Sequence, residues 1–96
     1  MLSSMGIRSP KWLVLAALVV ASPDTPGVYE LWDDEELLRI GIADKRRTLR
    51  EVLTRELLEE QVAATHFRWE ISFDPTTRQR ELIAELERED GSGGES

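Results

Sequence analysis

The chain has 96 residues, of which 41% are hydrophobic and 32% are charged, a composition typical of one small globular domain and not of a disordered chain. It contains no cysteine, which excludes disulfide bonds, thiolate metal sites and thiol nucleophiles, and its one histidine, His66, argues against a zinc site. The formal net charge of −7, from 12 basic and 19 acidic residues, argues against a general affinity for nucleic acid.

An uncharged apolar run from Trp12 to Ala21 follows residues 1–8, which we interpret as an N-terminal extension. Ser9 suits a helix N-cap and Pro10 suits the first helical position, so the run is predicted to be a helix that covers a sheet. Basic residues before the run and small residues at its end are also typical of a secretory signal peptide cleaved after Ala21. The run is too short to span a bilayer, which needs ~20 apolar residues. We favour the buried helix, and therefore a cytoplasmic protein with no membrane partner; the signal peptide would make the protein secreted.

A β-hairpin is predicted next along the chain. Residues 23–27 contain two prolines and one glycine and are expected to form a connecting turn. Val28 to Trp32 has the composition of a strand, residues 33–36 form a polar turn, and Leu37 to Ala43 follows as a second strand.

A capped helix and an alternating strand follow the hairpin. Thr48 and Glu51 form a capping-box pattern, and apolar residues at helical spacing extend this helix to about Val62. Apolar and polar residues then alternate from His66 to Phe73, which predicts a strand with one face in the core. The residues predicted to face the core are Phe67, Trp69, Ile71 and Phe73. The aromatic residues among them could instead stack nucleic-acid bases, but a core-facing strand requires the same spacing.

The last helix is predicted to begin at Asp74 and Pro75, which suit an N-cap and a first helical position. Residues 91–96 are predicted to be a disordered Gly/Ser tail. The predicted order is helix, strand, strand, helix, strand, helix. We therefore expect an α/β (α+β) fold, with a small three-stranded antiparallel sheet flanked by helices, in one domain from residue 9 to residue 90.

The predicted hairpin carries a paired motif. Pro26-Gly27-Val28-Tyr29 is followed by Arg39-Ile40-Gly41, with Arg39 ten residues after Tyr29. These residues resemble the paired motif of the GIY-YIG nuclease superfamily, and the helix, strand and acidic helix that follow are also similar, so the resemblance covers about Pro23 to Arg88. It implies a metal-dependent endonuclease, a hydrolase that cleaves DNA phosphodiesters with Mg²⁺ or Mn²⁺ as cofactor.

The resemblance also implies roles for individual residues. Tyr29 matches the tyrosine near the attacking water, and Gly41 matches the motif glycine, where the missing side chain would let substrate approach. Glu81 best matches the glutamate that holds the metal ion, with Glu85 next. Arg39 replaces the second motif tyrosine and would supply a phosphate-binding cation. Each residue also has a purely structural interpretation. Tyr29 would be a packed strand residue, Gly41 would mark a β-bulge, and Glu81 would be a surface carboxylate.

The first of the two downstream helices departs from the family pattern. The position of the catalytic arginine falls on Val52, and the position of a frequent histidine falls on Glu56. Arg50 could replace the arginine only if the helix register slipped, because Leu49 and Leu53 should face the core. We therefore expect little or no nuclease activity. The alternative function is a non-catalytic module that binds nucleic acid or a protein partner.

Basic residues outnumber acidic ones by six to two between Arg39 and Arg55, despite the acidic composition of the whole chain. This cluster is the candidate surface for DNA binding. Its members are Arg39, Lys45, Arg46, Arg47, Arg50 and Arg55, among which Lys45, Arg46 and Arg47 are the candidate substrate-binding residues. A solvated helix face would explain the same cluster without function, and His66 is expected to be a polar residue at a strand edge.

Overall fold

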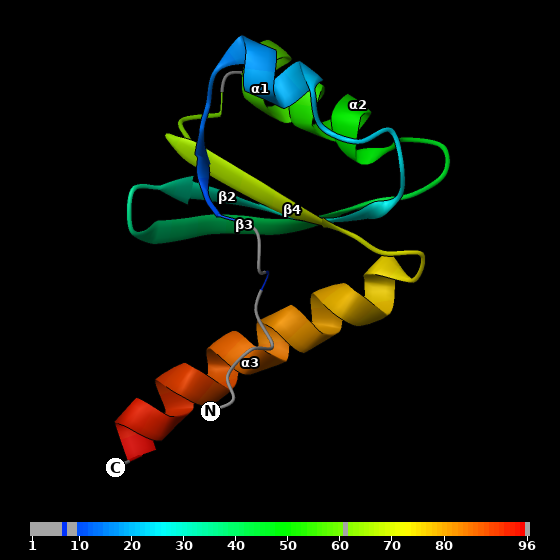
Figure 1. The fold of residues 1–96 in the computed structure, drawn as a ribbon. Coiled ribbons are helices and arrows are strands. Elements are labelled where there is room, and N and C mark those ends of the chain that lie inside the picture. Colours follow the sequence, from blue (N-terminus) through cyan, green and yellow to red (C-terminus); the bar gives the residue numbers. More distant parts are fainter. Residues whose placement is uncertain (1–6, 8–9, 61, 96) are drawn as a thin grey trace.

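The computed structural model describes Ile7, residues 10–60 and residues 62–95, with side chains described as far as residue 87. The helices and strands follow in the order shown in Figure 1. They are β1 (Trp12–Leu13), α1 (Ala16–Val20), β2 (Gly27–Asp33), β3 (Glu36–Ala43), α2 (Leu49–Leu53), the π-helical segment η1 (Thr54–Glu59), β4 (His66–Ile71) and α3 (Pro75–Glu95).

The described strands form one antiparallel sheet of four strands in the order β1-β4-β2-β3. The predicted hairpin is confirmed, since β2 pairs with β3 from Gly27↔Ala43 to Asp33↔Glu36, and its turn includes Asp34 with φ 56°, a conformation that aspartate tolerates. β4 pairs with the other side of β2. The α+β class is therefore confirmed, and the prediction of three strands is wrong by one.

The fourth strand comes from the apolar run that the sequence predicts to be a single helix. Trp12 and Leu13 are extended and pair with Phe67 and His66 of β4. The Trp12 ring lies 5.8 Å from the Phe67 ring and 5.2 Å from the Trp69 ring, between ring centroids. This aromatic packing and the backbone pairing favour the extended chain over a helix at residue 12.

The helix within that run is short and only half covered. α1 begins at Ala16, and Val19 is its buried residue, whereas Leu18 and Val20 are exposed. The buried-helix prediction is therefore correct for one face of residues 16–20 only. Within the described part of the chain, no helix is long and apolar enough to cross a bilayer.

The predicted helix from Thr48 is present, but its second half is π-helical. Thr48 has the extended backbone of an N-cap, yet its hydroxyl donates to Asp24 Oδ1 at 2.6 Å, so the predicted capping-box hydrogen bond is absent. Leu49, Leu53 and Leu57 are buried on one side across α2 and η1. The helix register expected from the apolar spacing is therefore confirmed.

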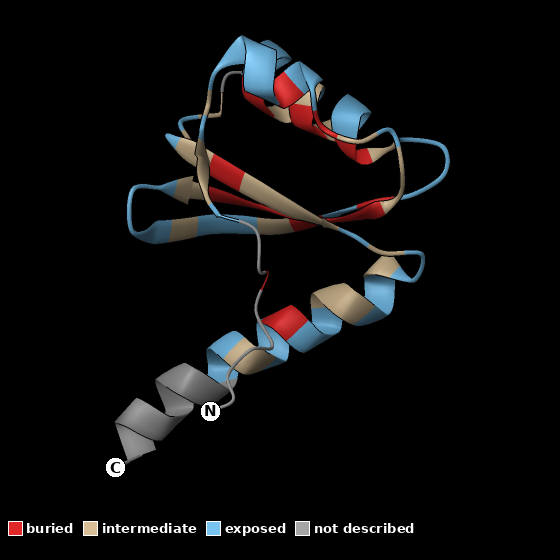
Figure 2. Cartoon of the chain, in the orientation of Figure 1, coloured by how far each residue is buried: buried red, intermediate tan, exposed pale blue. Residues whose placement is uncertain are grey.

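Helices cover both faces of the sheet, and each face has its own core (Figures 1 and 2). We call the face covered by α1, α2 and η1 the upper face, and the face covered by α3 the lower face. The upper core consists of Val19, Tyr29, Leu31, Ala43, Leu49, Leu53, Leu57 and Phe67. The lower core is smaller and consists of Ile7, Val28 and Leu82, with Ile40 packed against it. Ile7, which falls in the predicted N-terminal extension, is therefore part of the folded domain.

The end of β4 and the course of α3 differ from the expectations. β4 ends at Ile71, and Ile71 and Phe73 are 45% and 81% exposed, so their predicted core positions are wrong, whereas Phe67 is fully buried and Trp69 half-buried. Ser72 N–H still pairs with Pro26 O, next to the last β2–β4 pair, and the chain then turns away into α3, which begins at Pro75. The helical backbone of α3 continues to Glu95 and includes residues 91–95, for which the sequence predicts a flexible tail; Ser96 lies outside the described residues.

Candidate functional site

Tyr29 and Gly41, the two motif residues of the hairpin, lie opposite each other on β2 and β3. Tyr29 is 4% exposed and belongs to the upper core. A Cβ atom at Gly41 would overlap the Cε1, Cζ and Oη atoms of the Tyr29 ring. Glycine is therefore required at position 41 by the close approach of this ring, and not by a bulge in the strand.

Glu56 of η1 joins Tyr29 and Arg39 into one polar cluster at the edge of the upper core. Arg39 Nη1 donates to both carboxylate oxygens of Glu56, at 2.7 and 2.6 Å, and Tyr29 Oη donates to Oε2 at 3.3 Å. The Glu56 side chain is 18% exposed and that of Arg39 is 52% exposed. The structure thus brings together two predicted site residues, Tyr29 and Arg39, around a carboxylate that neutralises the arginine.

The phenol in this cluster resists ionisation. Burial, and after it the Glu56 carboxylate, raise the pKa of Tyr29 to about 12, while Arg39 opposes both effects. A general base must be deprotonated to accept a proton from water, so a phenol with this pKa is a poor base near neutral pH. The cluster therefore favours a neutral tyrosine that donates a hydrogen bond to Glu56.

The π-helical geometry of η1 accompanies this arrangement. Glu56 reaches the Tyr29 hydroxyl, while Leu53 and Leu57 on either side of it remain buried. π-Helical turns are rare, and they occur frequently at functional sites. The π-helical turn therefore coincides with the cluster of Tyr29, Arg39 and Glu56.

Arg50 lies outside the cluster. Its Nε donates to the backbone oxygen of Ser22 at 3.0 Å, and the residue is exposed. Val52, at the position that the resemblance equates with a catalytic arginine, packs against the upper core. Because the helix register is the one that the sequence predicts, no basic side chain of α2 replaces that arginine.

A surface pocket of about 390 Å³ lies beside Arg50. Its lining residues are Asp24, Arg50, Glu51, Thr54, Arg55 and Glu59. Two cations face three carboxylates in this pocket, so it has no excess positive charge to attract a phosphate. Of the basic cluster, Arg50 and Arg55 are therefore poor candidates for DNA contacts.

Lys45, Arg46 and Arg47 lie in the loop between β3 and α2, and all three are exposed. The Asp44 carboxylate accepts the backbone N–H groups of Arg46 and Arg47 at 2.9 Å each, which fixes the loop. These two hydrogen bonds lower the pKa of Asp44. None of the three basic side chains forms a salt bridge with another described residue, so the loop presents three cations to solvent beside the single carboxylate of Asp44.

Glu81, the predicted metal ligand, lies on α3 and therefore on the lower face, opposite to Tyr29 and Arg39. Its Oε1 accepts Arg78 Nη1 at 3.1 Å. Among the described residues, no group of three or more histidine, aspartate or glutamate side chains could hold a metal ion. The residues present do not fit a Mg²⁺ or Mn²⁺ site beside Tyr29, because Glu56, the carboxylate that touches Tyr29, is paired with Arg39 and Glu81 is on the other side of the sheet.

Arg78 itself is held by two carboxylates on the lower face. It donates to Glu70 of β4 from Nε at 2.9 Å and from Nη2 at 3.1 Å. The hydrogen bonds to Glu70 raise the pKa of Arg78, with a smaller contribution from Glu81. Glu81 therefore extends an ion-pair network that anchors α3 to the sheet.

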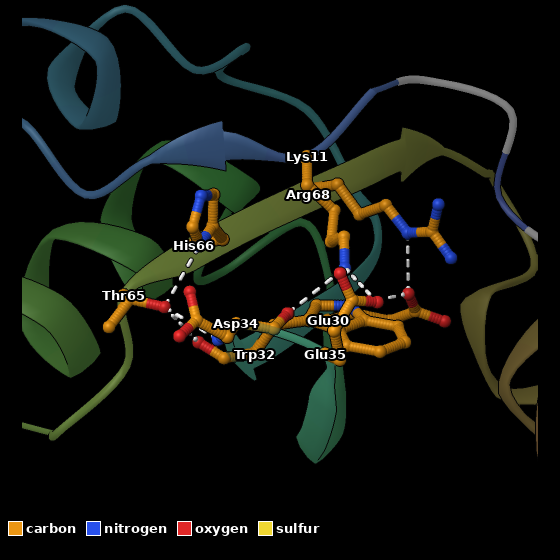
Figure 3. Close-up of polar contacts among 8 residues, drawn as sticks. All are labelled: Lys11, Glu30, Trp32, Asp34, Glu35, Thr65, His66 and Arg68. Carbon is orange, nitrogen blue, oxygen red and sulfur yellow. Dashed lines mark hydrogen bonds and ion pairs between the residues drawn. The ribbon is translucent and has the colours of Figure 1, made fainter.

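A second polar network, which the sequence did not predict, lies on the lower face of β2 and β4 (Figure 3). Glu30 is 4% exposed, and its Oε1 accepts Arg68 Nε at 2.6 Å and Trp32 Nε1 at 3.0 Å. Lys11 Nζ lies 4.0 Å from the centre of the Trp32 ring and donates to the backbone of the β2–β3 turn at Asp34. A charged residue in the middle of an apolar strand is the sequence signal that could have predicted this network. The partner of that residue could not be predicted, because it depends on the order of the strands in the sheet.

His66 lies at the end of this region, where its Nδ1 is 2.8 Å from the hydroxyl oxygen of Thr65. Thr65 Oγ1 also accepts the backbone N–H of Asp34 at 2.7 Å. His66 is half-buried at the start of β4. His66 is thus polar as expected, but it lies at the start of a strand that is paired on both sides, with Leu13 of β1 and Trp32 of β2.

The fold and the cluster define a small α+β domain with a buried tyrosine, an arginine and a glutamate in mutual contact at the edge of the upper core. Residues 6–90 match the family described as Domain of unknown function (DUF7508), and the chain belongs to that family. No curated protein and no solved structure matches the chain.

The raised pKa of Tyr29 can be measured directly, because it is the one tyrosine of the chain. We expect tyrosinate absorbance at 295 nm to appear well above pH 10, towards about pH 12. The folded protein keeps the phenol proton to a higher pH than the unfolded chain, so this group stabilises the fold below pH 10, and that contribution is lost as pH rises through about 12.

Glu56→Gln should move the Tyr29 titration down towards 10, because it removes the carboxylate and leaves Arg39 beside the phenol. Glu59→Gln, an exposed residue of the same π-helical segment, is the matched control and should leave the titration unchanged. A midpoint near 10 in the wild type, with the native circular dichroism retained, would contradict the geometry of the cluster.

Proposed function

We propose that this chain is a GIY-YIG-like domain, related to metal-dependent endonucleases that act on DNA phosphodiesters, that does not cleave DNA and serves as a non-catalytic interaction module. The observation that carries this proposal is the position of Glu56, which accepts hydrogen bonds from both Tyr29 and Arg39. The pairing of β2 with β3, which places Tyr29 opposite Gly41, supports the GIY-YIG-like relationship.

The electrostatics of the cluster oppose phosphodiester cleavage. Negative charge develops on phosphorus in the transition state and needs fixed cations nearby. Loss of a transition-state arginine can cost ~10³-fold or more in phosphoryl transfer. Here Glu56 neutralises Arg39, and Val52 occupies the position of the family arginine.

The interaction role has one specific candidate for a DNA contact, the loop of Lys45, Arg46 and Arg47. Its three cations are exposed and form no salt bridge with another described residue, and Asp44 holds the loop backbone. The net charge of −7 limits such binding to this loop and makes it sensitive to salt. The alternative is a module for a protein partner.

The test combines cleavage and binding on the same DNA. We expect no nicking of supercoiled plasmid above the blank with Mg²⁺ or Mn²⁺ at physiological salt, and no change in Glu81→Ala or Arg50→Ala. Robust wild-type cleavage that is abolished by Glu81→Ala would show that the domain is an enzyme. Cleavage that is also lost in Arg50→Ala would show that this side chain reaches the phosphate.

Binding is measured by the fluorescence anisotropy of a labelled duplex at two salt concentrations. Arg46→Gln should weaken binding and reduce the salt slope by about one, as expected for one lost phosphate contact. Arg80→Gln, on an exposed position of α3, is the control and should bind as the wild type does. Absence of binding to the duplex at low salt would leave the protein-partner module as the interaction role.

A further inference from the structure

The outer edge of β3 has no strand beside it in the part of the chain that the structure describes. β3 is the last strand in the order β1-β4-β2-β3, so its backbone pairs with β2 on one side only. Its regular part runs from Arg39 to Ala43, because the register with β2 shifts just before Arg39 and leaves Leu38 without a partner residue. An unpaired edge is a template for another strand unless charge or a covering segment blocks it. Beyond Arg39 this regular part carries no charged side chain.

Apolar side chains flank this edge on the lower face. Ile40 packs against the lower core, and Ile42, which lies on the same face of the strand, is 38% exposed. Gln79 of α3 donates from Nε2 to Ile40 O at 2.9 Å, so α3 runs beside the edge. Ile83 and Leu86 follow Gln79 at helical spacing on the same side of α3, and they are 39% and 37% exposed. A carbonyl oxygen has two lone pairs, so Ile40 O can still accept a backbone N–H.

The two ends of β3 carry opposite charges. The turn at its start contains four consecutive exposed carboxylates, and the loop after its end contains three consecutive exposed cations. The carboxylates belong to Asp33, Asp34, Glu35 and Glu36, and the cations to Lys45, Arg46 and Arg47. A second copy of the strand in antiparallel orientation reverses this order, so the acidic end of each copy meets the basic end of the other. A parallel copy would instead bring like charges together.

We propose that two copies of this chain form a dimer in which their β3 strands pair antiparallel, from Arg39 to Ala43, about a twofold axis at Gly41. In this register Ile40 of each copy lies opposite Ile42 of the other, so the apolar side chains of the two lower faces meet across the interface. A pairing of this length is well below the ~800 Å² per partner of a standard interface. The dimer is therefore weak and depends on protein concentration.

The net charge of −7 on each copy opposes association at long range. At physiological ionic strength the Debye length is ~8 Å, so this repulsion is largely screened, while charges that meet at the strand ends still interact. The dimer requires neither the GIY-YIG-like relationship nor binding to DNA. Because the same basic loop is the candidate DNA contact, dimerisation is measured without DNA, and the failure of one proposal leaves the other standing.

The experiment is sedimentation velocity of the full chain at physiological salt, from micromolar to millimolar concentration. The wild type should shift from monomer towards dimer as the concentration rises. Ile42→Lys should abolish the dimer, because a lysine on an edge strand is a common block to pairing between edges. Ile71→Lys is the matched control, since Ile71 is also exposed but lies at the end of β4, on the other side of β2, and this variant should dimerise as the wild type does.

An exchange of charges tests the antiparallel orientation. Glu36→Lys and Lys45→Glu each place like charges together at both ends of the pairing, and each should weaken the dimer roughly tenfold. The double variant Glu36→Lys/Lys45→Glu restores opposite charges and should dimerise nearly as well as the wild type. Both residues are exposed, so these variants keep the test decisive if Ile42→Lys fails to fold.

A wild type that stays monomeric at millimolar concentration would overturn the proposal. A dimer that persists in Ile42→Lys, or that is lost to the same extent in Ile71→Lys, would show that the copies do not meet along β3. Equal weakening in the single and double charge variants would exclude the antiparallel orientation.

Discussion

Phe67→Ala should lower the free energy of unfolding by ~3–5 kcal/mol, the usual cost of removing a fully buried phenylalanine. Phe67 is 0% exposed in the upper core, between Leu31 of β2 and Trp12 of β1. The substitution removes its ring contact with Trp12 and leaves a cavity between the sheet and the helices. Urea unfolding followed by circular dichroism measures the change.

Phe73→Ala is the matched control, because the same substitution removes the same atoms from a side chain that is 81% exposed. It should change the free energy of unfolding by less than ~0.5 kcal/mol. Domains of this size have ~5–15 kcal/mol of stability in total, so Phe67→Leu, with a cost of ~1 kcal/mol, provides a folded variant for the comparison. Equal effects at positions 67 and 73 would contradict the burial of β4.

These two residues also show how far alternation in a sequence predicts a core. Both lie on the apolar face of the strand predicted from His66 to Phe73, and periodicity alone gives them equal weight. The difference comes from the length of β4, which ends at Ile71, and from the turn that leads to α3. The end of β4 lies opposite the start of its partner strand β2, where Ile71 pairs with Gly27, and β2 is distant in the sequence.

The hairpin and the helix register were predictable because their signals are local. Strand composition around a polar turn predicts the pairing of β2 with β3, and apolar spacing predicts that Leu49 and Leu53 face the core. The same spacing predicts that Arg50 lies outside the core, and Arg50 is exposed. These local signals also bring Tyr29 and Arg39 into one place.

Features that depend on distant pairing were not predictable. β1 has two residues, too few for any periodic signal, and it forms because β4 offers an edge and aromatic rings to pack against. The side of the sheet on which Glu81 lies depends on where α3 packs after β4. The contact between Glu56 and Arg39 joins two residues 17 positions apart, on η1 and β3, and depends on how η1 packs against the sheet. Only the assembled sheet specifies these relations.

The network around Glu30 belongs to this second group, and it leads to the other large expected effect. Glu30→Ala should lower the free energy of unfolding by ~3 kcal/mol, because breaking a buried ion pair leaves the partner charge uncompensated. The Glu30 and Arg68 side chains are 6% and 21% exposed, so Arg68 would regain little hydration. Trp32 Nε1 would lose its acceptor as well.

Glu35→Ala is the control for the loss of one negative charge at the same end of the sheet. The Glu35 side chain is 97% exposed and lies 4.0 Å from Lys11, so its removal should have no measurable effect on unfolding. Glu30→Gln keeps an acceptor for Arg68 and Trp32, and its stability should fall between those of the wild type and Glu30→Ala.

The double variant Glu30→Ala/Arg68→Ala should be more stable than the sum of the two single changes predicts, because it leaves no buried charge unpaired. Additive single effects would show that Glu30 and Arg68 do not interact across β2 and β4.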